Sequence, residues 1–265
     1  MKPMSTLAAL ATATTLMASG AAAVTLEVTV TNNQAADGVF LTPLYVGFHD
    51  GSFDAFDVGS TASAGVERLA EEGDPSLVAA ERTVAAPTSQ GGVITGPAGF
   101  GSVAGQPPVL DAGETATLRI TVDASNRYLT FLSMIIPSND AFIGNDNPFA
   151  YEIFDAAGAF TGISPIEVTL GDIWDAGTEV NNGIGAAFNA AGGVGTDQNG
   201  TISLLGDPSA LFGQNTAAGT TIGSVLGNSV ATISVAAVPL PAGLPLMATA
   251  LGLFGLAGLK RTRRA

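Results

Sequence analysis

The 265-residue sequence contains no cysteine, a single histidine and a single tryptophan. Without cysteine, the chain can form neither a disulfide framework nor a thiolate metal site. His49 would have to serve as the base of any serine or cysteine nucleophile, yet no cysteine and no G-x-S-x-G motif is present. We therefore predict that this protein is not an enzyme.

Basic residues are also scarce. Nine lysines and arginines stand against 23 acidic residues, and five of the nine lie at the two ends of the chain. With those five removed, four arginines remain against 23 acids, a formal charge of −19 between Thr25 and Leu259. Because neutralising phosphates requires basic groups, this balance excludes nucleic-acid binding. An acidic surface attracts cations instead.

The N-terminal end is typical of a targeting segment. Lys2 is followed by the apolar run LAALATATTLMASG and by the small residues GAAAV. A charged start, an apolar middle and an A-x-A exit are the parts of a secretory signal peptide. We predict residues 1–23 as a signal peptide and export of the protein to the cell surface, the outer envelope or the extracellular matrix.

The C-terminal end, residues 238–265, reads VPLPAGLPLMATALGLFGLAGLKRTRRA. Its apolar part is just long enough to cross a bilayer, and the basic end would stay in the cytoplasm. The order of motif, apolar run and basic end resembles the PEP-CTERM class of bacterial sorting signals in its VPLPA variant. That resemblance implies a sorting enzyme of the exosortase type that cuts near the motif, so that the transmembrane helix anchors the protein in the inner membrane only transiently. A plain single-pass anchor is the alternative.

Residues 24–237 form one domain by length, with many short strand patterns and little helix. Apolar residues alternate with polar ones in VTLEVTVTNN near the start and in ETATLRITVDA in the middle, which is typical of half-buried strands. We predict an all-β fold, an antiparallel β-sandwich with one or two short helices. The apolar run YLTFLSMIIP follows ETATLRITVDA after a short turn, and these two runs are predicted to form a hairpin.

The remaining segments give further expectations. Residues 40–51 predict a strand with Pro43 near its start, and AYEIFDAAGAFTG predicts another strand. Helical spacing of Val66, Leu69 and Ala70 predicts a helix that stops at Gly73-Asp74-Pro75, and a second, weaker helix is predicted from Ser76 to Arg82. PIEVTLG, TISLL and SVATISVAAV predict the last strands, whereas residues 91–110 read as a loop with one short strand.

Acidic residues gather in two loops around the middle of the domain. Asp140 follows an apolar strand that breaks at Pro137, and LGDIWDAGTE sets Asp172, Asp175 and Glu179 around the only tryptophan, Trp174. Carboxylates four residues apart with a glycine between them can converge in a tight turn, and a third from another loop would make the cluster too repulsive to stay ionised without a cation. Calcium is the natural partner of such an oxygen-only set. In the alternative interpretation, Asp140 and Asp175 only accept hydrogen bonds within turns.

These two loops also carry a resemblance. The pair SMIIPSND and IWDAGTE resembles the two motifs of the spondin domain, and the similarity reaches over residues 28–183. The resemblance implies a C2-like β-sandwich and a calcium site whose ligands would be Asp140, Asp175 and Glu179. The family pattern has aspartate where this chain has Glu179, so the calcium affinity is the property most affected. The family also has a tryptophan at position 174, which implies that its ring supports the metal loop, with Phe142 as a neighbour.

Together these features predict a secreted or cell-surface, calcium-binding, spondin-like adhesion or extracellular-matrix protein without catalysis. Its partners would be a matrix or surface protein or a polysaccharide. The alternative is a carbohydrate-binding surface module that recognises exopolysaccharide. A hydrolase using Asp172, Asp175 and Glu179 is a third class, but one tryptophan and three tyrosines scarcely supply the aromatic platforms of a glycosidase cleft.

Overall fold

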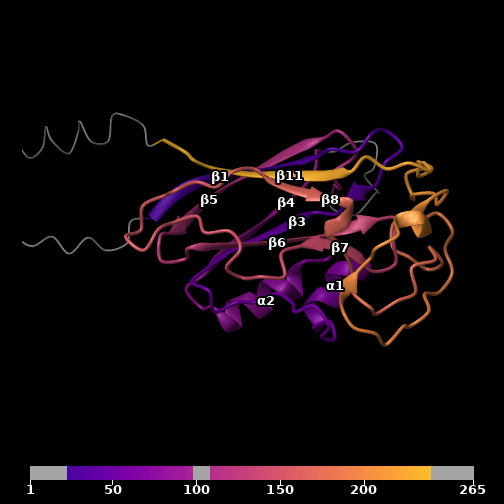
Figure 1. Ribbon diagram of the computed structural model, residues 1–265, viewed down its shortest axis with the longest axis horizontal. Helices are drawn as coiled ribbons and strands as arrows, with labels where there is room; N and C mark the ends of the chain where they lie inside the picture. Colours follow the sequence, from indigo (N-terminus) through magenta and orange to yellow (C-terminus); the bar gives the residue numbers. More distant parts are fainter. Residues whose placement is uncertain (1–22, 98–107, 240–265) are drawn as a thin grey trace, which may run out of the picture.

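A computed structural model describes residues 23–97 and 108–239 of the chain. Two antiparallel sheets face each other, and two short helices cover the outer face of one of them (Figure 1). The antiparallel β-sandwich predicted from the sequence is confirmed.

The four-stranded sheet has the order β5-β1-β11-β8. Its strands are β1 (Ala23–Asn32), β5 (Thr115–Asp123), β8 (Ile166–Thr169) and β11 (Ser229–Ala237). In β1, Leu26, Val28 and Val30 are fully buried while the polar residues between them are partly exposed, as the alternating sequence predicted. This sheet therefore buries one face only.

The second sheet has the order β10-β9-β7-β6-β3-β4, and β2 pairs with β6 beside this path. Its strands are β2 (Phe40–Leu41), β3 (Leu44–His49), β4 (Gln90–Ile94), β6 (Tyr128–Ile136), β7 (Ala141–Gly144), β9 (Ile173–Asp175) and β10 (Ser203–Leu204). Almost every residue of β6 is buried. A strand that is covered on both faces has no polar face to present, which explains its continuous apolar run.

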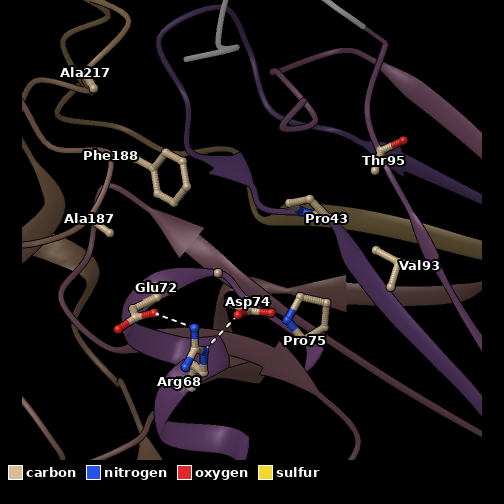
Figure 2. A pocket seen from close by; sticks show the side chains of 11 residues that line it. Pro43, Arg68, Glu72, Asp74, Pro75, Val93, Thr95, Ala187, Phe188 and Ala217 are labelled. Carbon is tan, nitrogen blue, oxygen red and sulfur yellow. Dashed lines mark hydrogen bonds and ion pairs between the residues drawn. The ribbon is translucent and has the colours of Figure 1, made fainter. Parts of the chain in front are cut away.

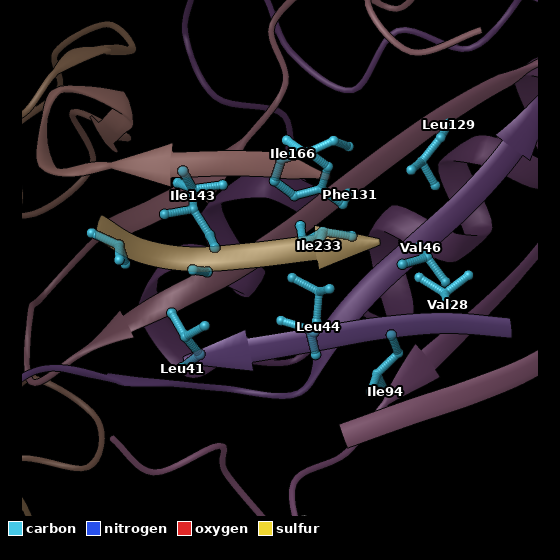
Figure 3. Close-up of a cluster of buried hydrophobic side chains, with 14 of the residues drawn as sticks. Val28, Leu41, Leu44, Val46, Ile94, Leu129, Phe131, Ile143, Ile166 and Ile233 are labelled. Carbon is cyan, nitrogen blue, oxygen red and sulfur yellow. The ribbon is translucent and has the colours of Figure 1, made fainter. Parts of the chain in front are cut away.

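The two faces of the second sheet bury two separate clusters. Phe131 and Ile143 belong, with Val28 and Ile233 of the first sheet, to the core between the sheets (Figure 3). The next residues along the strands, among them Leu132 and Phe142, contact the helices instead. Because successive side chains of a strand point to opposite faces, each strand contributes both to the core between the sheets and to the cluster under the helices.

The helices are α1 (Ala64–Glu72) and α2 (Ser76–Ala85). Ser63 caps α1 by accepting a hydrogen bond from Val66 N (3.2 Å), and Gly73 ends it in the left-handed conformation with φ +68°. The stop predicted at Gly73-Asp74-Pro75 is confirmed. The second helix continues three residues beyond Arg82.

The predicted hairpin is wrong. β5 pairs with β1 in the first sheet, whereas β6 lies in the second sheet between β3 and β7. The turn between them crosses from one sheet to the other, and Asn126 holds it by donating from its side chain to Thr88 O (2.8 Å) and Gln90 Oε1 (2.9 Å). A short turn after an alternating strand can lead to a hairpin within one sheet or to a strand of the other sheet, so the local sequence does not distinguish the two connections.

Three smaller differences concern strand boundaries. The strand predicted over residues 40–51 is divided at Thr42-Pro43 into β2 and β3, because proline lacks the amide hydrogen that a sheet requires. AYEIFDAAGAFTG forms only the isolated bridges Tyr128↔Glu152 and Phe154↔Phe160. The short strand expected within residues 91–110 is β4, which begins one residue earlier.

The predicted signal peptide and the predicted sorting tail lie outside the described residues, except for Ala23, Val238 and Pro239. Within the described ranges, none of the helices has the length and apolar character needed to cross a bilayer.

Candidate metal centre

The two acidic loops lie side by side because of strand register. β6 ends at Ile136, and the turn that follows returns the chain as β7, which pairs with β9 so that Ala141 lies opposite Asp175. Ser138 shapes this turn, since its backbone N–H donates to Ile135 O (3.0 Å) and its hydroxyl oxygen accepts from Ala141 N (3.0 Å). Asp140, the residue before Ala141, is thereby placed beside the loop that follows β9.

Asp140 is fully buried and enclosed by that loop. Its Oδ2 accepts hydrogen bonds from Thr178 N (2.8 Å) and Glu179 N (3.0 Å), and its Oδ1 accepts from Asn181 Nδ2 (2.6 Å). Burial raises the pKa of Asp140, the bond from Glu179 N opposes that rise, and the nearby Asp175 carboxylate adds to it.

Asp175 shares the same amide donor. Its Oδ1 accepts from Gly177 N (2.7 Å), and its Oδ2 accepts from Asn181 Nδ2 (3.1 Å). The orientation of the Asn181 amide is fixed from the other side, because its Oδ1 accepts from Asn139 N (3.0 Å) and Asp140 N (3.3 Å). One neutral nitrogen therefore lies between the two carboxylates.

Glu179 contributes differently from its predicted role. Its backbone N–H binds Asp140, but its Oε2 accepts from Asn139 Nδ2 (3.0 Å). The structure thus brings Asp140 and Asp175 together and directs the Glu179 side chain toward Asn139. In the part of the chain that the structure describes, no group of three or more histidine, aspartate and glutamate side chains is arranged to hold a metal ion. The assignment of all three residues as ligands stays a prediction.

Glu71, in the last turn of α1, is an acidic neighbour that sequence reasoning missed. Burial raises its pKa to about 7, a hydrogen bond with the Thr178 side chain lowers it, and the charges of Glu179 and Asp140 raise it further. The same Thr178 hydroxyl lies 3.3 Å from Asp140 Oδ2. No sequence motif links α1 to this loop, so only the packing of α1 against β6 and β7 shows that the two are close.

In the described ranges, no ion pair joins the carboxylates of this site to a basic side chain. Among the described residues, Arg68 pairs with Glu72 and Asp74, Arg119 with Glu27, and Arg127 with Glu152, while Arg82 donates to Ser89. The two carboxylates share the Asn181 amide nitrogen as a donor, and calcium binding by them stays a prediction.

Trp174 lies next to this loop. Its Nε1 donates to Gly144 O (2.9 Å), and its ring meets Phe56 edge to face at 5.5 Å between centroids. Phe142 lies opposite Trp174 in the β7–β9 pair, as the expected neighbour, and also contacts Phe56. Asp172 serves elsewhere, because its Oδ2 accepts from both the backbone N–H and the hydroxyl of Thr169 and caps the 3-10 helix Leu170–Asp172.

The model of the Spondin_N family matches residues 39–192, which is more than half of the chain. The chain belongs to the Spondin_N family. Both motifs that carried the resemblance, SMIIPSND and IWDAGTE, lie within the matched region. Spondin_N domains are typically extracellular and generally non-catalytic. A search of curated proteins gave no match.

Proposed function

We propose that this Spondin_N protein is a secreted or cell-surface calcium-binding protein that works by adhesion or matrix contact. The observation that carries the proposal is the convergence of Asp140 and Asp175 on a single atom without a basic side chain nearby. Calcium would neutralise these carboxylates and fix the loop after β9 against the β6–β7 turn. Asp140 and Asp175 would hold the ion, and Glu179 is the third ligand implied by the family pattern.

Thermal unfolding of the purified protein in calcium and in chelator tests this proposal. A ligand that binds only the folded state stabilises it by about 2.7 kcal/mol at a hundredfold excess over its Kd. Asp175→Asn should remove most of that gain. Asp207→Asn is the matched control, because Asp207 caps a different element, the 3-10 helix Pro208–Leu211, and asparagine caps equally well.

Trp174 fluorescence gives a second readout without deconvolution, since the chain has one tryptophan. Trp174 directly precedes Asp175 in β9, so a calcium ion held by Asp175 should change the emission of the wild-type protein. Unfolding curves and emission spectra that are the same in calcium and in chelator would refute calcium binding.

We further propose that the protein reaches its location through the C-terminal signal. Support comes from the sequence alone: the VPLPA motif, the apolar run and the basic end occur in this order in residues 238–265. A sorting enzyme of the exosortase type would cut near the motif after transient anchoring in the inner membrane. The partner on the outside would be a matrix or surface protein or polysaccharide.

A further inference from the structure

A groove of about 860 Å³ lies between the α1–α2 turn, the start of β3, β4 and the loop around Phe188 (Figure 2). Apolar side chains form most of its walls: Pro43, Pro75, Val93, Ala187, Phe188 and Ala217. Arg68, Glu72 and Asp74 line the side formed by the helix turn. This volume falls in the range of about 300–1,000 Å³ that is usual for ligand sites.

Phe188, which lines the groove, has a strained backbone conformation. Its φ is +60°, a conformation that bulky residues rarely adopt and that costs about 1–3 kcal/mol. Ala217 N holds it by donating to Phe188 O (2.6 Å), and its half-buried ring packs beside Ile136 while the ring edge stays in the groove (Figure 2). Burying a ring only in part does not require this strain, so presenting the ring to a ligand is the better explanation.

The charged side of the groove is acidic overall. Arg68 Nε lies 2.7 Å from Asp74 Oδ2, and its NH2 group lies 3.5 Å from Glu72 Oε2. Two carboxylates against one guanidinium leave one negative charge. The Glu72 side chain is 61% exposed, so its carboxylate is available to a partner.

We propose that this groove is the docking site for an extended protein segment that carries an arginine or lysine beside apolar residues. A basic side chain would lie between the Phe188 ring and the Glu72 carboxylate, where both attract a cation. The apolar neighbours of that side chain would contact Pro43, Pro75 and Val93. The strongly acidic body of the protein favours a basic partner at long range as well.

A sugar fits this lining less well. Sugar hydroxyls need many hydrogen-bonding groups, whereas most of the side chains that line this groove are apolar. The proposal names the partner class for the adhesive function proposed above and rests on it. It does not rest on calcium, because no residue of the groove is a predicted calcium ligand.

Selection of a random peptide display library on the full chain, in calcium and in chelator, tests the proposal. Enriched peptides should carry arginine or lysine next to apolar residues. Phe188→Gly should weaken their binding at least about tenfold, since it removes the ring and leaves a residue that accepts positive φ. The matched control is Asn199→Gly, an exposed site with φ +53° whose affinity should not change.

Substitutions of glutamates in α1 test whether the negative charge of the groove contributes to binding. Glu72→Gln should weaken binding about threefold and reduce its dependence on salt, whereas Glu67→Gln, on the exposed side of the same helix, should leave both unchanged. If the peptides bind Phe188→Gly as tightly as the wild-type protein, the groove is not their docking site, although the proposed adhesive function would remain possible at another surface. Failure to enrich any peptide, or a glycan array signal that Phe188→Gly abolishes, would overturn the protein-segment proposal. If calcium does not stabilise the protein but the peptides still bind in the groove, only the proposed metal site would be contradicted.

Discussion

At the scale of single residues, Asn181 decides how the protein tolerates two neighbouring carboxylates. Its amide nitrogen binds Asp140 and Asp175 together, and its amide oxygen binds the β6–β7 turn. A neutral donor hydrogen-bonds to both acids but does not neutralise their charge. The site can therefore form without a cation, and we expect that a cation would stabilise it further.

We expect Asn181→Ala to lower the free energy of unfolding by about 2–4 kcal/mol in chelator, because two carboxylates lose a shared donor. Calcium should restore part of the loss, since the ion can take over the pairing. Urea unfolding with and without calcium measures both effects. Asn182→Ala is the control, because Asn182 is exposed and bonds only within its own loop and to Asn139 through its backbone, which alanine retains. Equal losses in the two variants would contradict the bridging role of Asn181.

His49 is a second residue whose surroundings determine a property of the whole fold. It is fully buried, its Nδ1 accepts from Gly51 N (3.1 Å), and its Nε2 therefore carries the proton and donates to Thr130 Oγ1 (2.9 Å). Burial lowers its pKa from 6.5 to about 4, the Asp50 carboxylate opposes this, and the Arg82 charge adds to it. The folded state thus binds fewer protons at His49 than the unfolded state.

We expect this histidine to destabilise the protein as pH falls from about 6.5 to 4, by about 3 kcal/mol at the acid end. The raised pKa of Glu71 acts in the opposite direction, because the folded state there binds more protons than the unfolded state. His49→Gln should remove only the histidine contribution. The difference between wild-type and variant unfolding free energies at pH 7 and pH 4.5 isolates it, and parallel pH profiles would contradict it.

At the scale of elements, the α1–α2 turn holds the helix pair on the second sheet. Gly73 ends α1 with a positive φ, and a Cβ at this position would lie 2.5 Å from Thr42 Cγ2. Thr42 in turn accepts at its hydroxyl from Met134 N (3.0 Å) in β6. Glycine is therefore required both for the turn and for the close approach to the sheet.

Gly73→Ala should lower the free energy of unfolding by about 2–4 kcal/mol, since backbone strain and a clash add together. Gly59→Ala is the matched control, because Gly59 has φ +85° but a Cβ at this position would meet no atom within 4 Å. It should cost only about 1–2 kcal/mol, the strain alone. Chemical denaturation of both variants measures the difference. Equal costs would show that the contact with Thr42 is unimportant.

At the scale of the whole molecule, both described ends leave the same end of the sandwich. β1 and β11 are antiparallel neighbours, with Leu26 opposite Ala237 and Val238 N donating to Thr25 O (2.8 Å). The orange loops that follow β9 lie at the opposite end (Figure 1). A tail anchored in a membrane would thus direct the candidate metal centre away from that membrane.

Replacing Pro239 and Pro241 with alanine separates a sorting signal from a plain anchor. If an enzyme reads the VPLPA motif, the loss of the extended backbone that proline favours should block cleavage and leave membrane insertion intact. The full-length protein would then accumulate in the inner membrane. Mass spectrometry of the native protein gives the direct test, because a mature chain that still ends at Ala265 at its final location would leave only the anchor.

Elements with local signals could be predicted from the amino-acid sequence. Alternation in β1 predicted its buried face, and the helical spacing that stops at Gly73 predicted α1. These predictions succeeded because a strand face or a helix cap depends on residues within a few positions of one another. The family likewise followed from two short motifs, which a match over residues 39–192 then bore out.

Features that depend on contacts between distant segments emerged only in the folded chain. Only the sheet pairing shows that β5 and β6 belong to different sheets, because an alternating strand can pair on either side of a sandwich. Only packing brings Glu71 to the acidic loop and turns Glu179 toward Asn139. The positive φ of Phe188 has no sequence signal, since phenylalanine ordinarily avoids it, and long-range contacts alone can hold it there.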